Sequence, residues 1–354
     1  TKEKPLEVFP GGTITFVLEC NPSSLNGIVS AVVELKAADG SERSVSATCK
    51  AAKLAKPVAC IDPVQPGSTV IPQTPLTLTS KCSKASEGQK IKSYQWSVTQ
   101  PQGSIATIGP NNSAKAIGLQ PNVAGDYEFE LVVTDDTGAK SDPAKVLVNV
   151  LPDNKLHIEA TWVQEGDKDK TDDKGCDIDL HLAHPLAPTV KGQKDYDNDG
   201  QPEPWFAQCY DCFWLNCNPG GQPVWGDPAD LFDDPTVDLD DTDGWGPENL
   251  SIKYPEKTVN GKPAWYWIGL YVFSDAAMGK CTPKVRIFLD STEVFNKKGP
   301  DMVTKDMWCA GKVKWDGAGD AADVVPCFSG GTGQELRPKY PFLSPSAFTC
   351  PPPI

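Results

Sequence analysis

The sequence predicts an all-β protein built from tandem β-sandwich domains. Pro (33) and Gly (30) are both plentiful, and short apolar–polar alternations are separated by turn residues, with few long apolar helical stripes. Of 354 residues, 39% are hydrophobic and 23% are charged, which is the composition of a globular chain. This length predicts two to three domains.

The net charge of −14 narrows the range of partners. Nucleic-acid binding relies on Lys and Arg that neutralise phosphates, and docking on anionic lipid relies on the same residues. We therefore expect cations, glycans, other surface proteins or copies of this chain as partners. No run of about 20 apolar residues predicts a membrane span. Residues 1–12 look like a trimmed N-terminus, which leaves an upstream export signal or lipid anchor open.

Residues 1–56 are expected to form a short β segment, a partial immunoglobulin-like sandwich. Alternating residues predict strands at 13–20, 30–37 and 41–49, and "ADGS" at 38–41 predicts a hairpin turn. Three or four strands are few for an independent sandwich, so this segment is expected to lean on its neighbour or on another chain.

Residues 57–151 show strands every 8 to 12 residues, the rhythm of an immunoglobulin-like sandwich. Within them, "YQWS" at 94–97 and "AGDYEFELVVTDDTG" at 124–138 resemble the Tyr–Trp strand and the Gly–Tyr–Leu–Val–Asp–Gly hairpin of PKD domains. The resemblance covers most of the segment and implies a spacer or interaction module of a cell-surface protein. Trp96 is expected in its core.

Residues 152–328 are expected to form a larger β-sandwich, and residues 329–354 a Pro-rich tail. The sandwich contains an insertion at 185–263 that is rich in Asp, Trp, Gly, Pro and Cys. So long a loop needs braces, for which disulfides and bound metal are the candidates. Strands are expected at 155–163, 176–184, 264–274, 283–290 and 310–317.

Twelve cysteines, an even number, indicate an oxidising, extracellular compartment. We expect Cys20 to pair with Cys49, Cys60 with Cys82, and Cys327 with Cys350. The eight cysteines from Cys176 onward allow 105 pairings, which spacing alone does not resolve. A zinc site is the alternative for the Cys-x-x-Cys pair, although an oxidising compartment favours disulfides. The other candidates are Cys176, Cys209, Cys212, Cys217, Cys281 and Cys309.

Three acidic motifs in this domain predict calcium. Asp177 and Asp179 share one strand face with His181, while "DYDNDG" at 195–200 matches the first half of a calcium loop. Its second half departs from the EF-hand, with Phe206 where a Glu is expected. The third motif, at 233–250, holds seven carboxylates and no basic residue. The expected ligands are Asp177, Asp179, Asp195, Asp197, Asp199, Glu203, Asp238, Asp240, Asp241 and Asp243.

Together with Trp162, with "DCFWLNCNP" at 211–219 and with "YWIGLYVFSD" at 266–275, these motifs resemble the C-terminal β-sandwich modules of exported surface proteins of myxobacteria and related bacteria. These proteins are often lipid-anchored. The resemblance covers most of residues 155–317. It implies a compartment and a fold rather than an activity.

The favoured function is therefore a non-enzymatic, calcium-stabilised structural or adhesive role at a bacterial surface, with assembly into a fibre as one form. A carbohydrate-binding module that uses exposed Trp side chains is the alternative, and core packing of those rings is the competing interpretation. Glycoside hydrolysis is a remote alternative, because these carboxylates cluster by local spacing as cation ligands do, whereas a general acid needs an isolated apolar setting. The candidate ligand-binding residues are Trp205, Trp214, Trp225 and Trp245.

Overall fold

The computed structural model describes residues 27–36, 40–51, 55–109, 112–113, 115–169, 172, 174–196, 200–207, 209–217, 223–242, 244–315, 322–327 and 336–342. These residues confirm the all-β fold, since their only helical element is a 3-10 turn at Ala187–Thr189 (η2). Within them, no helix has the length and hydropathy needed to cross a bilayer.

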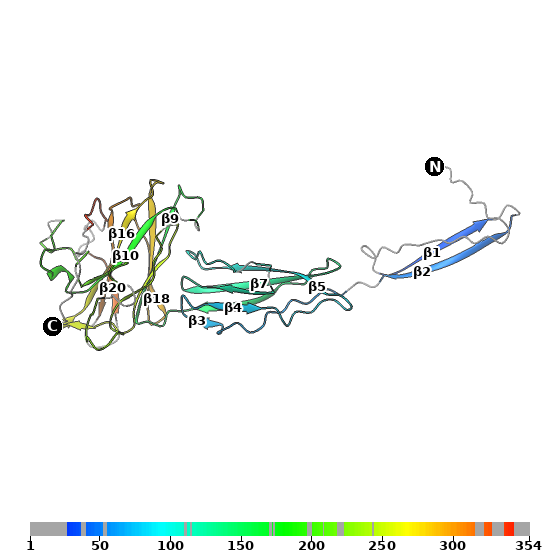
Figure 1. The fold of residues 1–354 in the computed structure, drawn as a ribbon, viewed down its shortest axis with the longest axis horizontal. Helices are drawn as coiled ribbons and strands as arrows, with labels where there is room; N and C mark the ends of the chain where they lie inside the picture. Colours follow the sequence, from blue (N-terminus) through cyan, green and yellow to red (C-terminus); the bar gives the residue numbers. More distant parts are fainter. Residues whose placement is uncertain are drawn as a thin grey trace.

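The N-terminal segment contains an antiparallel hairpin of β1 (Gly27–Lys36) and β2 (Glu42–Ala51), as the sequence predicts (Figure 1). Gly40 in the connection has a φ of 85°, a conformation that glycine adopts without steric cost. The strand expected at 13–20 and the expected Cys20–Cys49 bond lie outside the described residues.

The middle domain has a four-stranded sheet and a two-stranded sheet. Its core alternates as the sequence predicts, because every second residue of the long strand β7 is buried, from Tyr127 to Val133. Trp96 is 1% exposed, which confirms its expected place in the core, and Cys60 bonds Cys82 as expected. The strand order is β3 (Thr69–Val70), β8 (Ala144–Val150), β7 (Gly125–Asp135) and β5 (Ile91–Thr99), with β4 (Leu76–Thr79) pairing β6 (Ala116–Leu119).

The C-terminal domain is a sandwich of two larger sheets. One has the order β11 (Asp211–Cys212), β10 (Asp177–Ala183), β16 (Trp265–Ser274), β19 (Met307–Trp315) and β20 (Ala322–Val325), and β21 (Leu336–Arg337) also pairs β19. The other has the order β12 (Thr236–Leu239), β13 (Glu248–Ile252), β9 (Leu156–Gln164), β17 (Cys281–Leu289) and β18 (Thr292–Lys298). A small hairpin joins β14 (Thr258–Val259) to β15 (Lys262–Pro263).

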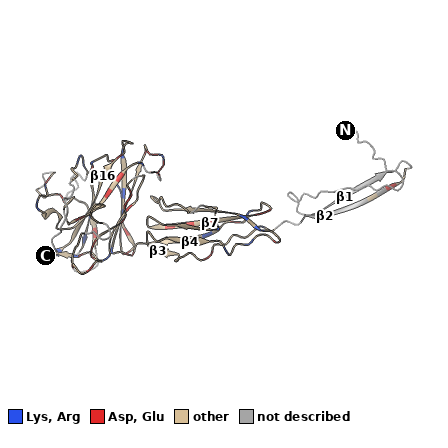
Figure 2. Cartoon of the chain, in the orientation of Figure 1, with Lys and Arg blue, Asp and Glu red and all other residues tan. Residues whose placement is uncertain are grey.

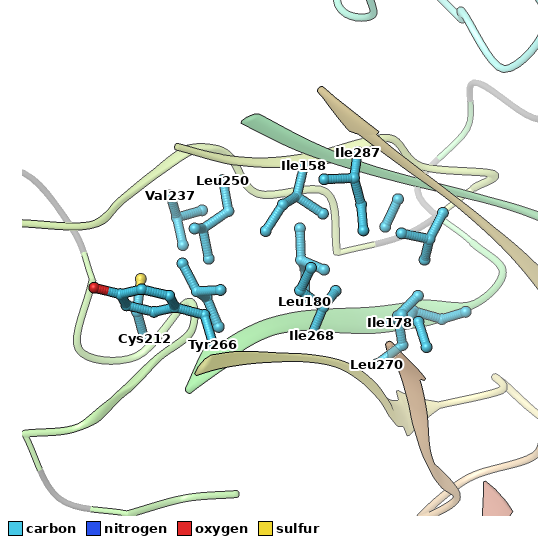
Figure 3. Close-up of a cluster of buried hydrophobic side chains, with 14 of the residues drawn as sticks. Ile158, Ile178, Leu180, Cys212, Val237, Leu250, Tyr266, Ile268, Leu270 and Ile287 are labelled. Carbon is cyan, nitrogen blue, oxygen red and sulfur yellow. The ribbon is translucent and has the colours of Figure 1, made fainter. Parts of the chain in front are cut away.

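The core of this domain lies between the two sheets. Figure 3 shows Ile158, Leu250 and Ile287 of the five-stranded sheet facing Leu180 and Ile268 of the other sheet, and all five are at most 1% exposed. The alternation of apolar residues along β9, β10 and β16 places one face of each strand in this core. The five strands expected in the domain are therefore all present.

Disulfides brace the sandwich. Cys176 before β10 bonds Cys281 at the start of β17, which ties the two sheets together. Cys212 bonds Cys217 within the insertion. The Cys-x-x-Cys pair is therefore part of a disulfide rather than of a zinc site. Cys209 is also disulfide-bonded.

One expected pairing is wrong. Cys327 bonds Cys309 rather than Cys350, because β20 pairs antiparallel with β19 and brings the chain that follows it back beside Cys309. The two Cα atoms are 6.1 Å apart, within the range that a disulfide spans.

The middle domain packs its end against the outer face of the five-stranded sheet (Figure 1). Only residues 151–155 connect β8 to β9. Gly103 in the middle domain lies so close to this face that a Cβ there would be 2.6 Å from Thr161 Cγ2. A side chain at this position is therefore incompatible with the observed approach.

Candidate cation and ligand sites

The acidic stretch at 233–250 enters the sheet as two antiparallel strands. Val237 and Leu250 lie in the core, which explains the apolar residues that alternate with its carboxylates. The intervening loop turns back at Gly244, whose N–H donates to Lys174 O, 2.7 Å away. The stretch therefore wraps over the beginning of β10, where Asp177 and Asp179 lie.

Four carboxylates from these two segments form a cluster, which we call the Asp179–Glu248 cluster. Glu248 is 1% exposed, and its Oε2 accepts a hydrogen bond from the backbone N–H of Leu180 at 2.5 Å. This bond places the Glu248 carboxylate beside Asp179, which is 2% exposed. Asp177 and Asp240, at the half-buried and exposed edge, complete the cluster. Figure 2 marks Asp and Glu on the strands of this domain as well as on its loops.

The cluster disfavours the ionised forms of its two buried carboxylates. Burial raises the pKa of both Asp179 and Glu248 well above the usual range, and neighbouring carboxylates raise each pKa further. The Trp214 indole favours the charged form of Asp179 and lowers its pKa. None of the neighbours that shift these two pKa values is a Lys or an Arg.

Two buried oxygens of the cluster lack donors. Asp179 Oδ2 and Glu248 Oε1 have no hydrogen-bond partner, although buried polar atoms almost always have one. Among the described residues, no three His, Cys, Asp or Glu side chains are already arranged as a metal-binding group. Asp243 of the expected ligand set lies outside those residues.

The other expected ligands are placed elsewhere. Asp238 Oδ2 accepts from Ser251 Oγ at 2.5 Å and lies 3.8 Å from His157 Nδ1, so it belongs to the outer face of the five-stranded sheet and not to the cluster. Asp241 is half-buried in the loop that follows β12. The structure thus brings Asp177, Asp179 and Asp240 together, as the sequence predicts, and separates Asp238 from them.

The second acidic motif forms a loop that closes on itself. Asp195 Oδ2 accepts from the N–H of Gly200 at 2.8 Å, and both oxygens of the buried Glu203 accept from the N–H of Tyr196. Asp197 and Asp199 lie outside the described residues. The prediction of calcium at this loop stays a prediction.

Two of the four candidate ligand-binding Trp residues are buried. Trp205 is 2% exposed and packs on Gly269, while Trp225 is 1% exposed and donates its indole N–H to Cys209 O. Neither ring can stack on a ligand from solution, so the expectation that they bind one is wrong. Trp205 packs with Tyr271 over the outer face of β16, whereas Trp225 packs against Tyr266 in the core between the sheets.

The other two rings are half-buried. Trp245 lines a groove of about 630 Å³ between the middle and C-terminal domains. Gly103 and Ser104 line one side of this groove, and Lys284 and Lys298 line the other. An aromatic face with polar neighbours in a concave setting is a common arrangement for small ligands.

His181 is a structural histidine. Its Nδ1 lies 2.8 Å from Asp211 Oδ2, and both side chains are fully buried. The imidazole stacks on Phe213 with ring centroids 4.7 Å apart and meets the edge of Phe206. Asp211 also accepts from the N–H of Phe206, so this pair organises the aromatic layer over β10.

The joint between the two domains contains an ion pair that sequence reasoning missed. Glu159 is fully buried and accepts from Ala124 N at 2.5 Å and from Arg286 Nη1 at 3.0 Å. Arg286 Nη1 also donates to Ala124 O, and Asn249 Nδ2 donates to Asn122 O. The polar residues His157, Glu159 and Thr161 alternate with apolar ones along β9, a pattern that ordinarily indicates a solvated outer face, so no local signal pointed to the buried pair.

The fold and these sites define a disulfide-braced tandem of β-sandwiches. Residues 67–150 match a family model whose description is that of a PKD domain. These residues are thus a PKD domain, which confirms the resemblance at 94–97 and 124–138. No curated protein matches the chain.

The solved structures with similar folds are distant. The PKD domain of the KIAA 1837 protein is 24% identical and covers 28% of this chain and 90% of its own, with a TM-score of 0.22. A carbohydrate-binding module of the β-sandwich superfamily is 12% identical over 68% of this chain and 98% of its own, with a TM-score of 0.24. Domains 4–9 of the surface layer protein SbsC are 13% identical over 78% of this chain and 35% of their own, with a TM-score of 0.19. Outside the PKD domain, the matches are distant β-sandwich likenesses. The disulfides and the PKD domain indicate a secreted protein.

Proposed function

We propose that the chain is a non-enzymatic structural or adhesive element of a bacterial cell surface, stabilised by calcium. The observation that carries this proposal is the joint between the PKD and C-terminal domains. A fully buried Glu159 bonded to Ala124 and Arg286 holds the two domains in one relative orientation. A fixed spacing between domains is what a spacer or an adhesive stalk needs.

The disulfides support the same role. Both folded domains carry covalent braces, one in the PKD domain and at least three in the C-terminal domain. Such bonds stabilise the folded domains and persist in an oxidising compartment.

The test has two parts. Immuno-electron microscopy of the native source should find the chain at the cell surface, and light scattering of the purified chain with calcium should detect assembly at high concentration. A chain that is absent from the surface contradicts the whole proposal. A chain at the surface that stays monomeric contradicts only the fibre form.

A second candidate function is glycan binding at the groove beside Trp245. The half-buried ring and the adjacent Lys284 and Lys298 provide a stacking face and hydrogen-bond donors. A glycan array with the intact chain tests this idea, and Trp245→Ala is the matched variant. The candidate stands if binding depends on Trp245, and it fails if no glycan binds.

A further inference from the structure

We infer that the Asp179–Glu248 cluster is a calcium site and that Glu248 is one of its ligands. This inference deepens the calcium component of the proposed function. It does not depend on the adhesive role, because an ion that binds here would stabilise the C-terminal domain whatever the chain adheres to.

The first argument is the fixed position of the two buried carboxylates. The Leu180 amide holds one oxygen of Glu248 at 2.5 Å and leaves the other, Oε1, without a donor. Asp179 Oδ2 is likewise without a partner, and both side chains are at least 98% buried. Two such oxygens in a protein interior need a proton or a cation, because unpaired buried charge is strongly destabilising, and one cation between them would satisfy both.

The second argument is the chemistry of the donors. The cluster offers only carboxylate oxygens, which are the ligands of hard cations, and no sulfur or free imidazole of the kind that zinc prefers. Calcium accepts six to eight oxygens in flexible geometry, whereas magnesium demands a near-ideal octahedron. Carboxylates contributed by β10, by β13 and by the loop after β12 fit the flexible geometry.

The third argument is access. Asp240 is exposed and Asp177 is half-buried, so the cluster runs from the surface to the buried pair. A cation reaches Asp179 and Glu248 by passing these two carboxylates. The site would then link β10 of one sheet to β13 of the other at an end of the sandwich where no strand pairing joins them.

The experiment uses the intact, disulfide-bonded chain and calcium itself. The chain is stripped with EDTA, and residual metal is measured by elemental analysis. Isothermal titration with calcium should give a Kd near 10⁻⁴ to 10⁻³ M, the usual range of extracellular modules. Glu248→Gln should weaken calcium binding at least about tenfold, whereas Asp238→Asn, a variant in the same acidic stretch but on the other sheet face, should leave it unchanged.

A second readout separates binding from folding. Terbium, a calcium substitute, should show emission sensitised by the Trp214 indole that adjoins Asp179, and Trp214→Phe should reduce the emission without weakening calcium binding. In EDTA, Glu248→Gln should melt no lower than the wild type, because the substitution removes a buried charge. The inference is overturned if the stripped wild type binds no calcium and carried none, or if Glu248→Gln binds calcium as the wild type does.

Discussion

The PKD domain and the C-terminal domain differ in how many carboxylates they bury and in how these are stabilised. Among the described residues, the PKD domain buries one carboxylate, Asp135, and the C-terminal domain buries nine. Asp135 accepts from Ser86 Oγ and Thr137 Oγ1, each at 2.6 Å, and these bonds hold its pKa below the usual value. The nine are Glu159, Asp167, Asp179, Glu203, Asp211, Asp233, Asp234, Glu248 and Asp306.

The contrast shows two ways to stabilise a sandwich. The PKD domain is an alternating apolar core whose one buried charge is satisfied by hydroxyl and amide donors, from Thr137 and Ala139 close in sequence and from Ser86, 49 positions away. In the C-terminal domain most buried carboxylates also accept from nearby amides, but Glu159 and Glu248 depend on Arg286 and on the Leu180 amide, which are 127 and 68 positions away. Its stability should therefore respond more strongly to the loss of long-range links.

The largest expected effect is the loss of the bond between Cys176 and Cys281. These residues are 105 positions apart, against 22 for Cys60 and Cys82. In the chain-entropy model the longer loop contributes about 4.7 kcal/mol and the shorter one about 3 kcal/mol. Hydrogen exchange with mass spectrometry on the two double Cys→Ala variants should show the larger loss in the C-terminal domain. Equal losses in the two domains would remove the contrast.

The second prediction concerns the joint. Glu159→Ala removes the buried partner of Arg286, which keeps its ion pair with Glu293 at 2.7 Å, so the cost should lie below the about 3–5 kcal/mol of a buried charge left wholly unpaired. The matched control is Glu128→Ala, which breaks the exposed pair with Lys145 and should cost about 0–1 kcal/mol. Denaturant unfolding measures both costs, and small-angle scattering of Glu159→Ala should show a broader range of interdomain distances. An unchanged scattering profile would mean that the ion pair does not fix the orientation.

The third prediction is a pair of opposite pH responses. Burial raises the pKa of Asp233 to about 6, so the folded state holds this proton more tightly and stability falls as pH rises from about 4 to about 6. Asp233→Asn should remove that fall and stabilise the chain at pH 7 by on the order of 1 kcal/mol, since nearby solvent screens the charge.

Asp135 has the opposite sign. Its lowered pKa contributes stability above pH 3.8 that is lost as pH falls through the lower folded-state pKa. Asp135→Asn should therefore destabilise the PKD domain at pH 7 and make its stability depend less on pH in the acid range. Denaturant midpoints measured from pH 3 to 8 test both responses. The comparison would be contradicted if the two Asn variants shifted the midpoint at pH 7 in the same direction.

The smallest expected effect is that of Trp245→Ala. The ring is half-buried at the groove between the domains, so its loss should cost less than the about 3–5 kcal/mol typical of a fully buried Trp. Thermal melting measures this cost. A larger loss would identify Trp245 as a packing residue of the joint and weaken the glycan-binding candidate.

Strand alternation made most of the fold predictable. The strands expected at 155–163 and 264–274 are observed at Leu156–Gln164 and Trp265–Ser274, because one face of each is apolar at every second residue. The acidic stretch was harder to interpret, since β12 and β13 are short and their carboxylates mask the alternation of Val237 and Leu250.

The sites were predictable only where their residues are close in sequence. The spacing of Asp177 and Asp179 predicted that they lie close together, and the charge of Asp177 does raise the pKa of Asp179. Glu248 joins them through the Leu180 amide, a contact between residues 68 positions apart, and no local pattern encodes it. Arg286, which lies 127 positions from Glu159, was missed for the same reason.

The short connection between the PKD and C-terminal domains has a mechanical consequence. The chain leaves β8 and, after residues 151–155, becomes β9, which lies in the middle of its sheet between β13 and β17. Tension along the chain therefore enters the C-terminal domain through a strand with nine cross-strand residue pairs on one side and five on the other. A strand held on both sides cannot be peeled away from an edge. An element loaded in this way resists extension, because the hydrogen bonds on both of its sides must break before it can leave the sheet.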